Sequence, residues 1–191
     1  GYTPPLRIYA TKASAAKMCE TIDAHEAAYA SGKKIRTSNF RIEYHPVEVG
    51  VPFSVGEYTF TPLKARHAQG VESVIYVIDN TAEDKHILWA HDTGVFYPSV
   101  TEWLESYPHV FDLVSLDCTL GRGKLITTAH MDIGQCAEMK SVLEKIGVAD
   151  AHTRFLLSHI GHLLERTLDE LAAEASEFGM EPAYDGMEII L

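Results

Sequence analysis

Hydrophobic and polar positions along this chain follow two different periods, which separate predicted strands from predicted helices. Short, continuous apolar runs are typical of buried strands. Apolar residues that recur every three or four positions are typical of helices that bury one face. The runs predict strands at 6–10, 58–63, 74–78, 87–90, 111–116, 155–158 and 187–191. The helical spacing predicts helices at 11–30, 98–107, 133–146 and 163–178.

The order of these elements indicates an α/β fold. Strands and helices alternate in the second half of the chain, whereas residues 40–71 hold short β segments broken by proline and glycine. Such alternation is typical of layered α/β domains. The 191 residues show no linker, repeat or low-complexity tract, and 46% of them are hydrophobic. We therefore predict one domain over residues 1–191 with a well-buried core.

Charge and composition argue against several classes of function for this chain. The formal net charge is −11, and lysine and arginine occur only in short, scattered groups. A groove for a phosphate backbone needs clustered basic residues, so nucleic-acid binding is disfavoured. No apolar run approaches the roughly 20 residues that cross a bilayer, and nothing at the start resembles a signal peptide, so we expect no membrane association. Three cysteines without CxxC spacing favour a reducing, cytoplasmic setting.

Four predicted strands lead to an ionisable residue at or soon after their ends. These residues are His67, Asp92, Asp117 and His159. In α/β folds the chemistry gathers at the edge where strands end, because the strands are rigid there and the loops beyond them are free to vary. Each residue also has a simpler interpretation. Asp92 could cap a turn, His67 could be an ordinary loop histidine, and His159 with His162 could be hydrogen-bonded core histidines.

Two imidazoles and a carboxylate from separate strand ends suit Zn²⁺ or Mn²⁺ better than Ca²⁺ or Mg²⁺. Here these would be His67, Asp92 and His159. A carboxylate can bridge two cations, but three ligands are too few to hold two. A metal would also supply the positive charge with which an acidic protein binds a small anion. His130 and Asp132 precede the predicted helix 133–146, and Asp132 alone could be the N-cap of that helix.

Other catalytic chemistries have weaker support in the sequence. The chain has no GxSxG motif for a serine nucleophile, and no GxGxxG motif or P-loop for a nucleotide. Cys118 could act as a nucleophile with a distant histidine. Because it directly follows a predicted buried strand, a structural thiol is favoured.

The order of the motifs resembles the metallo-β-lactamase fold hydrolases. Within them it is most similar to the PhnP-type phosphodiesterases that open phosphoribosyl cyclic phosphate. The matching pieces are FTPL with His67, WAHDT at 89–93, LDCT at 116–119, His130, LSHIGH at 157–162 and YDGMEI at 184–189. The resemblance implies a four-layered αββα sandwich that lacks its amino-terminal strands, because the family's HxHxDH motif is absent from this chain.

The resemblance also implies roles for individual residues. His67 and His159 would each bind one of two divalent metal ions, Zn or Mn, with Asp92 as the bridging carboxylate. His130 would stand near the scissile phosphate as a general acid or as a donor to the leaving oxygen, and Asp132 could orient it. His162 would belong to a second or structural metal site, whose cysteines nothing in this chain supplies.

These implications define the function we expect. The protein would be a binuclear, metal-dependent phosphodiesterase that acts on a small cyclic phosphate or a related diester. We expect this chain to be the carboxy-terminal part of a longer protein, with an incomplete metal site and no turnover of its own. The alternatives are a hydrolase of the same fold acting on a lactone, a thioester or an RNA end, or a non-catalytic, metal-free module. The expected partner is a small anionic substrate, and a homodimer is left open.

Overall fold

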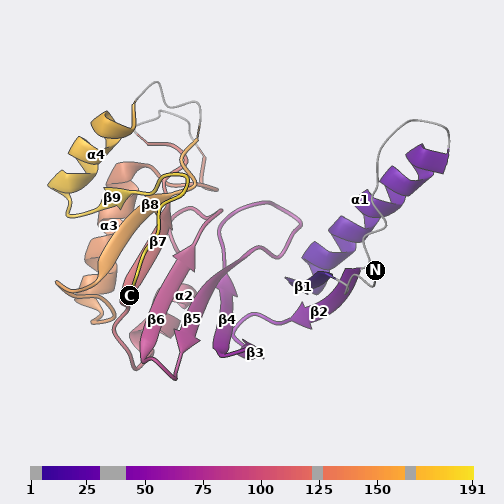
Figure 1. Ribbon diagram of the computed structural model, residues 1–191, viewed down its shortest axis with the longest axis horizontal. Coiled ribbons are helices and arrows are strands. Elements are labelled where there is room, and N and C mark those ends of the chain that lie inside the picture. Colours follow the sequence, from indigo (N-terminus) through magenta and orange to yellow (C-terminus); the bar gives the residue numbers. More distant parts are fainter. Residues whose placement is uncertain (1–5, 31–41, 122–126, 162–166) are drawn as a thin grey trace.

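A computed structural model describes residues 6–30, 42–121, 127–161 and 167–191, and these form two sheets and four helices (Figure 1). In chain order the elements are β1 (Leu6–Thr11), α1 (Lys12–Ala30), β2 (Ile42–Val47), β3 (Phe53–Val55), β4 (Tyr58–Lys64), β5 (Val74–Asn80), β6 (Lys85–Ala90), α2 (Pro98–Glu105), β7 (Leu113–Asp117), α3 (Ile133–Lys145), β8 (Arg154–Ser158), α4 (Leu168–Glu177) and β9 (Glu181–Pro182).

The larger sheet has seven strands in the order β3-β4-β5-β6-β7-β8-β9. Strands β3 to β6 pair antiparallel, and β6 to β9 pair parallel. Antiparallel neighbours need only short turns, whereas parallel neighbours need a crossover. Helices α2, α3 and α4 supply the three crossovers from β6 to β9. The parallel half of this mixed sheet is therefore the half in which several strand ends share one edge.

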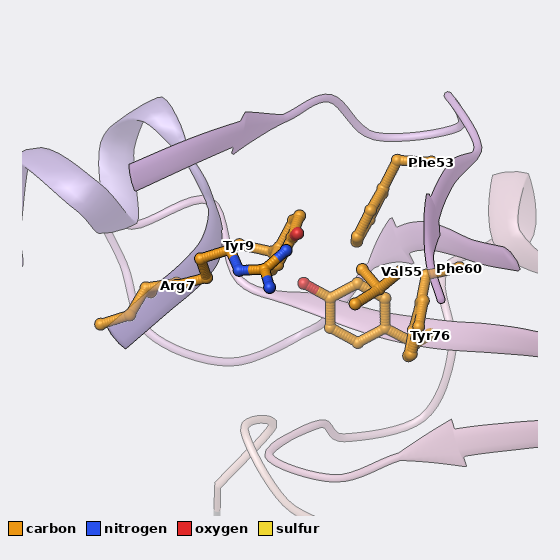
Figure 2. A pocket seen from close by; sticks show the side chains of 7 residues that line it. Arg7, Tyr9, Phe53, Val55, Phe60 and Tyr76 are labelled. Carbon is orange, nitrogen blue, oxygen red and sulfur yellow. The ribbon is translucent and has the colours of Figure 1, made fainter. Parts of the chain in front are cut away.

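The second sheet consists of β1 and β2, paired in parallel and joined by α1. In Figure 1 it lies beside β3 and β4, at the end of the molecule away from α4. The aromatic ring of Tyr9 on β1 stacks on Phe53 of β3 with 5.2 Å between centroids, and Phe53 stacks on Phe60 at 5.5 Å. These rings line a pocket of about 510 Å³ between the two sheets, together with Arg7 and Tyr76 (Figure 2).

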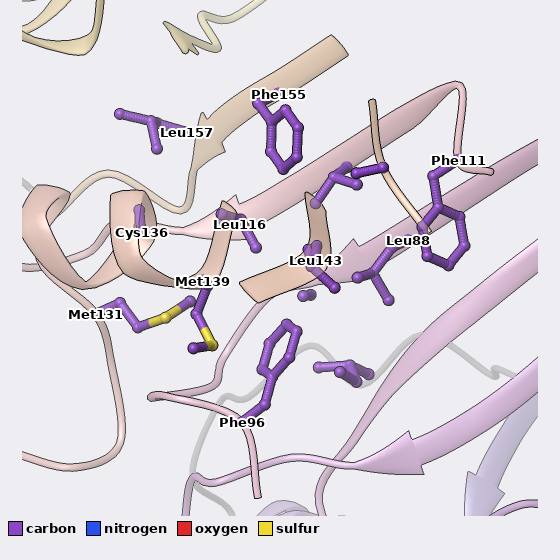
Figure 3. Packing of buried hydrophobic residues seen from close by; sticks show 14 of the residues in the cluster. Leu88, Phe96, Phe111, Leu116, Met131, Cys136, Met139, Leu143, Phe155 and Leu157 are labelled. Atoms are coloured by element: carbon purple, nitrogen blue, oxygen red, sulfur yellow. The ribbon is translucent and has the colours of Figure 1, made fainter. Parts of the chain in front are cut away.

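The main hydrophobic core lies between one face of the large sheet and its helices (Figure 3). Side chains alternate across a strand, so every second residue reaches this face. On the strands these are Ile75, Val77, Leu88, Ala90, Val114, Leu116, Phe155 and Leu157. The helices contribute the buried residues Val100 and Leu104 from α2, Cys136, Met139 and Leu143 from α3, and Leu171 and Ala175 from α4.

The α/β class predicted from the sequence is confirmed, and most elements lie within one or two residues of their predicted bounds. The four-layered αββα arrangement and the missing amino-terminal strands stay predictions. The predicted helix 163–178 is described from Leu168, and residues 163–166 lie outside the described part. Among the residues that the structure describes, no helix is both long enough and apolar enough to cross a membrane.

The predicted strand at 187–191 is wrong. These residues form no strand, and the side chain of Ile190 is 95% exposed. The sheet instead takes the residues that follow Gly179, where Glu181 pairs with Leu156 and Pro182 with Leu157. The chain reaches the edge of β8 as soon as α4 ends, and residues 187–191 pair with none of the described strands. An apolar run by itself therefore did not identify the last strand.

Candidate metal centre

The carboxyl ends of β6, β7 and β8 bring three ionisable residues to one edge of the large sheet. Asp92 follows β6, Asp117 ends β7, and His159 follows β8. The parallel register aligns these ends, with Ala90 opposite Leu116 and Asp117 opposite Ser158. His67, which follows β4, reaches the same edge.

One carboxylate oxygen is shared by two imidazoles. Oδ1 of Asp92 lies 3.2 Å from Nε2 of His159 and 3.7 Å from Nε2 of His67. Asp92 and His159 both have left-handed backbone, with φ of 49° and 57°. Residues other than glycine adopt this conformation rarely and at a cost in free energy, and such positions cluster at functional sites. The structure thus brings together the three residues that the sequence analysis proposed as metal ligands.

Hydrogen bonds on the far nitrogens determine what the two imidazoles present to Asp92. Nδ1 of His67 donates to the carbonyl oxygen of Ala129 at 3.3 Å. Nδ1 of His159 donates to Oγ1 of Thr119 at 2.7 Å. In a neutral imidazole the other nitrogen then carries a lone pair. Two imidazole nitrogens therefore face one carboxylate oxygen, and divalent cations are the groups that such an arrangement can hold.

Asp117 organises the residues behind this convergence. Its side chain is fully buried, and a buried carboxylate needs hydrogen-bond donors. Four donors surround it: the backbone N–H of Thr93 at 3.1 Å, the backbone N–H and the hydroxyl of Thr119 at 2.9 and 2.7 Å, and Nδ1 of His130 at 2.8 Å. Asp117 therefore fixes the loops after β6 and β7 and the ring of His130 at once.

His130 lies against both candidate ligand histidines. Its ring stacks on His159 with 5.6 Å between centroids and meets His67 edge-on at 4.9 Å. One ligand atom each of Asp92, Asp117, His130 and His159 lies within 4.8 Å of the others. Because Nδ1 of His130 is held by Asp117, its Nε2 is the nitrogen left to exchange a proton with a bound molecule.

Asp132 does not orient His130, although the resemblance implied that it could. Its Oδ1 accepts the backbone N–H of Gln135 at 2.8 Å, and the Gln135 side chain returns a bond to the backbone of Asp132. This reciprocal pair is a capping box for α3. The carboxylate that holds His130 is Asp117, so the simpler interpretation of Asp132 as an N-cap matches the structure.

His91 also lies at the site, although the sequence analysis gave it no role. Its Nε2 is 2.7 Å from Oγ of Ser115, which is 2.8 Å from Oγ of Ser158. Burial lowers the pKa of His91, and nearby His159 lowers it further, while Asp117 and Asp92 act in the opposite direction. The net lowering favours a neutral imidazole. The sequence signal that could have identified His91 as a site residue is its position directly before Asp92.

Two glycines allow the loops of the site to approach closely. A Cβ on Gly94 would lie 1.9 Å from the carbonyl oxygen of Thr128, and a Cβ on Gly161 would lie 2.7 Å from that of Thr119. The backbone N–H of Gly94 also donates to Arg66 at 2.9 Å, which ties the loop of His67 to the loop of Asp92. His162 lies outside the described residues, so its predicted role stays a prediction.

No protein-family model matches the chain, and no curated protein matches it either. Solved structures do. The metallo-β-lactamase fold protein YhfI from Bacillus subtilis is 18% identical, with 96% of this chain and 64% of that chain covered and a TM-score of 0.62. Unliganded yeast PDE1 is 13% identical, with 97% and 60% covered and a TM-score of 0.61. Igni18, a metallo hydrolase from the archaeon Ignicoccus hospitalis, is 14% identical, with 93% and 74% covered and a TM-score of 0.53.

At these identities the likeness shows the fold alone. The chain spans 64% of the length of the Bacillus protein and 60% of the length of the yeast protein. The metal-ligand roles and the reaction therefore rest on the residues described above and on the proposal that follows.

Proposed function

Given that this chain has the metallo-β-lactamase fold, we propose that it is part of a metal-dependent hydrolase, and specifically of a phosphodiesterase. One observation carries the proposal. The Nε2 atoms of His67 and His159, from different loops, both face Oδ1 of Asp92, at 3.7 and 3.2 Å. Imidazole nitrogen and carboxylate oxygen are the donors that hold catalytic Zn²⁺ in hydrolases.

The residues divide into metal ligands and residues that act on protons. His67 and His159 would each hold one of two divalent cations, Zn or Mn, and Asp92 would bridge them. When bound, such cations neutralise negative charge on a phosphoryl group and lower the pKa of water. Asp117 and Thr119 orient His159 and His130 through the bonds given above. Three protein ligands make this shell incomplete for two cations.

His130 is the proposed general acid. Asp117 accepts its Nδ1–H and fixes the orientation of the ring. When the ring is protonated, the proton on Nε2 can pass to the leaving oxygen of a phosphodiester. Groups placed in this way typically contribute about 10²–10⁴-fold to the rate. The side chain of His130 is 20% exposed, so a substrate can reach it while the ring stays fixed.

The choice of a small cyclic phosphate or related diester rests on the resemblance in motif order and on the charge balance. With 16 basic against 27 acidic residues, the chain offers little to a long phosphate backbone. A small anion needs only the charge of the metal centre. A lactone, a thioester or an RNA end remains the alternative substrate, and a metal-free module is the alternative from a different class.

Metal content tests the proposal first. The purified chain, equilibrated with Zn²⁺ or Mn²⁺ and desalted, should retain metal that the Asp92→Asn variant does not retain. Asparagine tolerates the left-handed backbone of this position, so the variant keeps the loop while losing the charge. Equal metal content in the two proteins would contradict the assignment of Asp92.

Turnover tests the reaction class. The full-length gene product, loaded with Zn²⁺ or Mn²⁺, should hydrolyse bis-para-nitrophenyl phosphate, and addition of a chelator should abolish the reaction. Hydrolysis of a lactone or a thioester without diester hydrolysis would support the alternative substrate. Metal binding without any hydrolysis by that protein would overturn the enzymatic proposal.

A further inference from the structure

A second cluster of metal-binding residue types lies at the opposite end of β6. It consists of Asp84, His86 and His109, and one ligand atom of each lies within 4.8 Å of the others. His86 is near the start of β6, whereas Asp92 follows the end of that strand. The six-residue separation places the clusters about 20 Å apart along the strand. This cluster is therefore separate from the candidate metal centre.

His86 is the buried member, with 5% exposure, and its proton is located by its neighbours. Nδ1 lies 2.8 Å from Oδ1 of Asp79 and 3.0 Å from the hydroxyl of Tyr107. That hydroxyl donates to Asp79, and burial together with this bond raises the pKa of Tyr107, so it keeps its proton. Nδ1 of His86 is then the donor to Asp79, which leaves Nε2 as the nitrogen that can bind a cation.

Nε2 of His86 faces a carboxylate. It lies 3.4 Å from Oδ1 of Asp84, which accepts a hydrogen bond from Nε2 when that nitrogen carries a proton and shares a cation with it when it does not. The ring of His109 stacks on that of His86, with 3.9 Å between centroids and 21° between planes. A buried imidazole whose partners are acceptors is the arrangement that a cation stabilises.

We propose that Asp84, His86 and His109 bind a transition-metal cation such as Zn²⁺, with Asp79 orienting His86. Two imidazole nitrogens and one carboxylate oxygen suit Zn²⁺, and the Asp79–His86 pair reproduces the carboxylate–histidine–zinc relay of known sites. Tetrahedral zinc places its ligand atoms about 3.4 Å apart. The 3.4 Å contact between Asp84 and His86 already has this length, and closure of the exposed His109 side chain would complete the set.

The backbone around the cluster is held firmly on two sides. The turn before β6 is tied by Asn80, whose amide donates to Glu83 at 3.0 Å and whose oxygen accepts the N–H of Ala82 at 3.2 Å. On the other side Asp112, just before β7, accepts the backbone N–H of His86 at 2.8 Å. A cation would therefore join the β5–β6 turn to the loop between α2 and β7. We infer a structural role, because these two segments carry no part of the candidate centre.

Zinc binding to the purified chain tests this site. Zn²⁺ should shift the Nε2 resonance of His86 in long-range ¹H–¹⁵N spectra and raise the melting temperature, since a cation that binds only the folded state stabilises it. His109→Ala should lose one zinc equivalent and the shift of His86. Asp84→Asn should do the same, and asparagine tolerates the φ of 53° at this position. Asp79→Asn, which keeps the shape of the side chain, should weaken zinc affinity about 10–100-fold.

Two controls make the result specific. His152→Ala removes another exposed histidine, from a turn outside the cluster, and should keep the full zinc content. Asp92→Asn, which alters only the candidate metal centre, should keep the zinc equivalent bound by this cluster. The test of the cluster therefore gives a result even if the proposed function is wrong. Spectra that show both nitrogens of His86 protonated and unaffected by Zn²⁺ would overturn the proposal, because His86 would then be a cation between Asp79 and Asp84. Unchanged zinc content in His109→Ala and Asp84→Asn would overturn it as well.

Discussion

Oδ1 of Asp92 lies 3.2 Å from Nε2 of His159, although the two residues follow different strands and each has left-handed backbone. The parallel pairing of β6, β7 and β8 creates this relationship, because it places the carboxyl ends of the three strands at one edge. The site therefore depends on the register of the sheet as much as on the ligand residues themselves.

The first prediction concerns His159. His159→Asn should lower metal retention by the chain, because it removes the imidazole donor that lies 3.2 Å from Asp92. Asparagine is among the residues that accept the φ of 57° at this position, so the free energy of unfolding without metal should change by about 1 kcal/mol or less. Metal analysis after desalting, with urea unfolding in chelator as the stability measurement, checks both expectations. Full metal retention would exclude His159 as a ligand.

The second prediction concerns His130 and Asp117. If the proposed function is correct, His130→Ala should lower kcat by about 10²–10⁴-fold with little change in metal content, since a proton donor is lost and no ligand. Asp117→Asn should lower kcat as well, and the double variant should be worse than His130→Ala alone. The reason is that Asp117 also holds the loops that carry Asp92 and His159. Steady-state kinetics with metal analysis makes the comparison. Loss of a metal equivalent in His130→Ala would show instead that His130 is a ligand.

The third prediction concerns the close approach at Gly94. Gly94→Ala should destabilise the fold by about 3 kcal/mol, because the added Cβ would lie 1.9 Å from the backbone oxygen of Thr128 and one loop must move. Gly134→Ala is the matched control. Its Cβ meets only a side-chain oxygen of Asp132 at 3.3 Å, and alanine favours a helix, so its stability should change by less than about 1 kcal/mol. Urea unfolding of both variants decides the point, and equal stabilities would contradict it.

The fourth prediction concerns the pH dependence of stability through Asp112. Burial acts to raise the pKa of this carboxyl, but bonds from the Lys85 ammonium at 2.9 Å and the backbone N–H of His86 at 2.8 Å outweigh it, and the net pKa is lowered. A lowered pKa in the folded state means that the stabilisation is present above the ordinary value of 3.8 and is lost as the pH falls below it.

Asp112→Asn should therefore destabilise the protein by about 1–2 kcal/mol near neutral pH. The difference from the unsubstituted protein should shrink as the pH falls below 3.8 and through the lowered pKa of the folded state. Urea unfolding across this range measures it, with Asp185→Asn at an exposed turn as the control. A difference that stays constant with pH would mean that the charge of Asp112 does not contribute.

The sequence by itself determined the local elements and the positions of the strand-end residues. Period and run length identify a strand or a helix because they reflect which face of an element is buried, and this was sufficient to single out His67, Asp92 and His159. It failed where burial depends on distant partners. The apolar run at 187–191 was predicted as a strand, although the edge of β8 had already been taken by β9.

Only the tertiary structure decided which carboxylate hydrogen-bonds to His130. It also decided that Asp84, His86 and His109 lie together. Asp132 is two residues from His130 in the chain, yet the capping of α3 engages it, and Asp117 reaches His130 from β7. His109 lies in the loop after α2 and meets His86 only because that loop folds back on the β5–β6 turn. Neighbours in sequence share an element, whereas partners in a site are set by strand register and loop contacts, which no local pattern encodes.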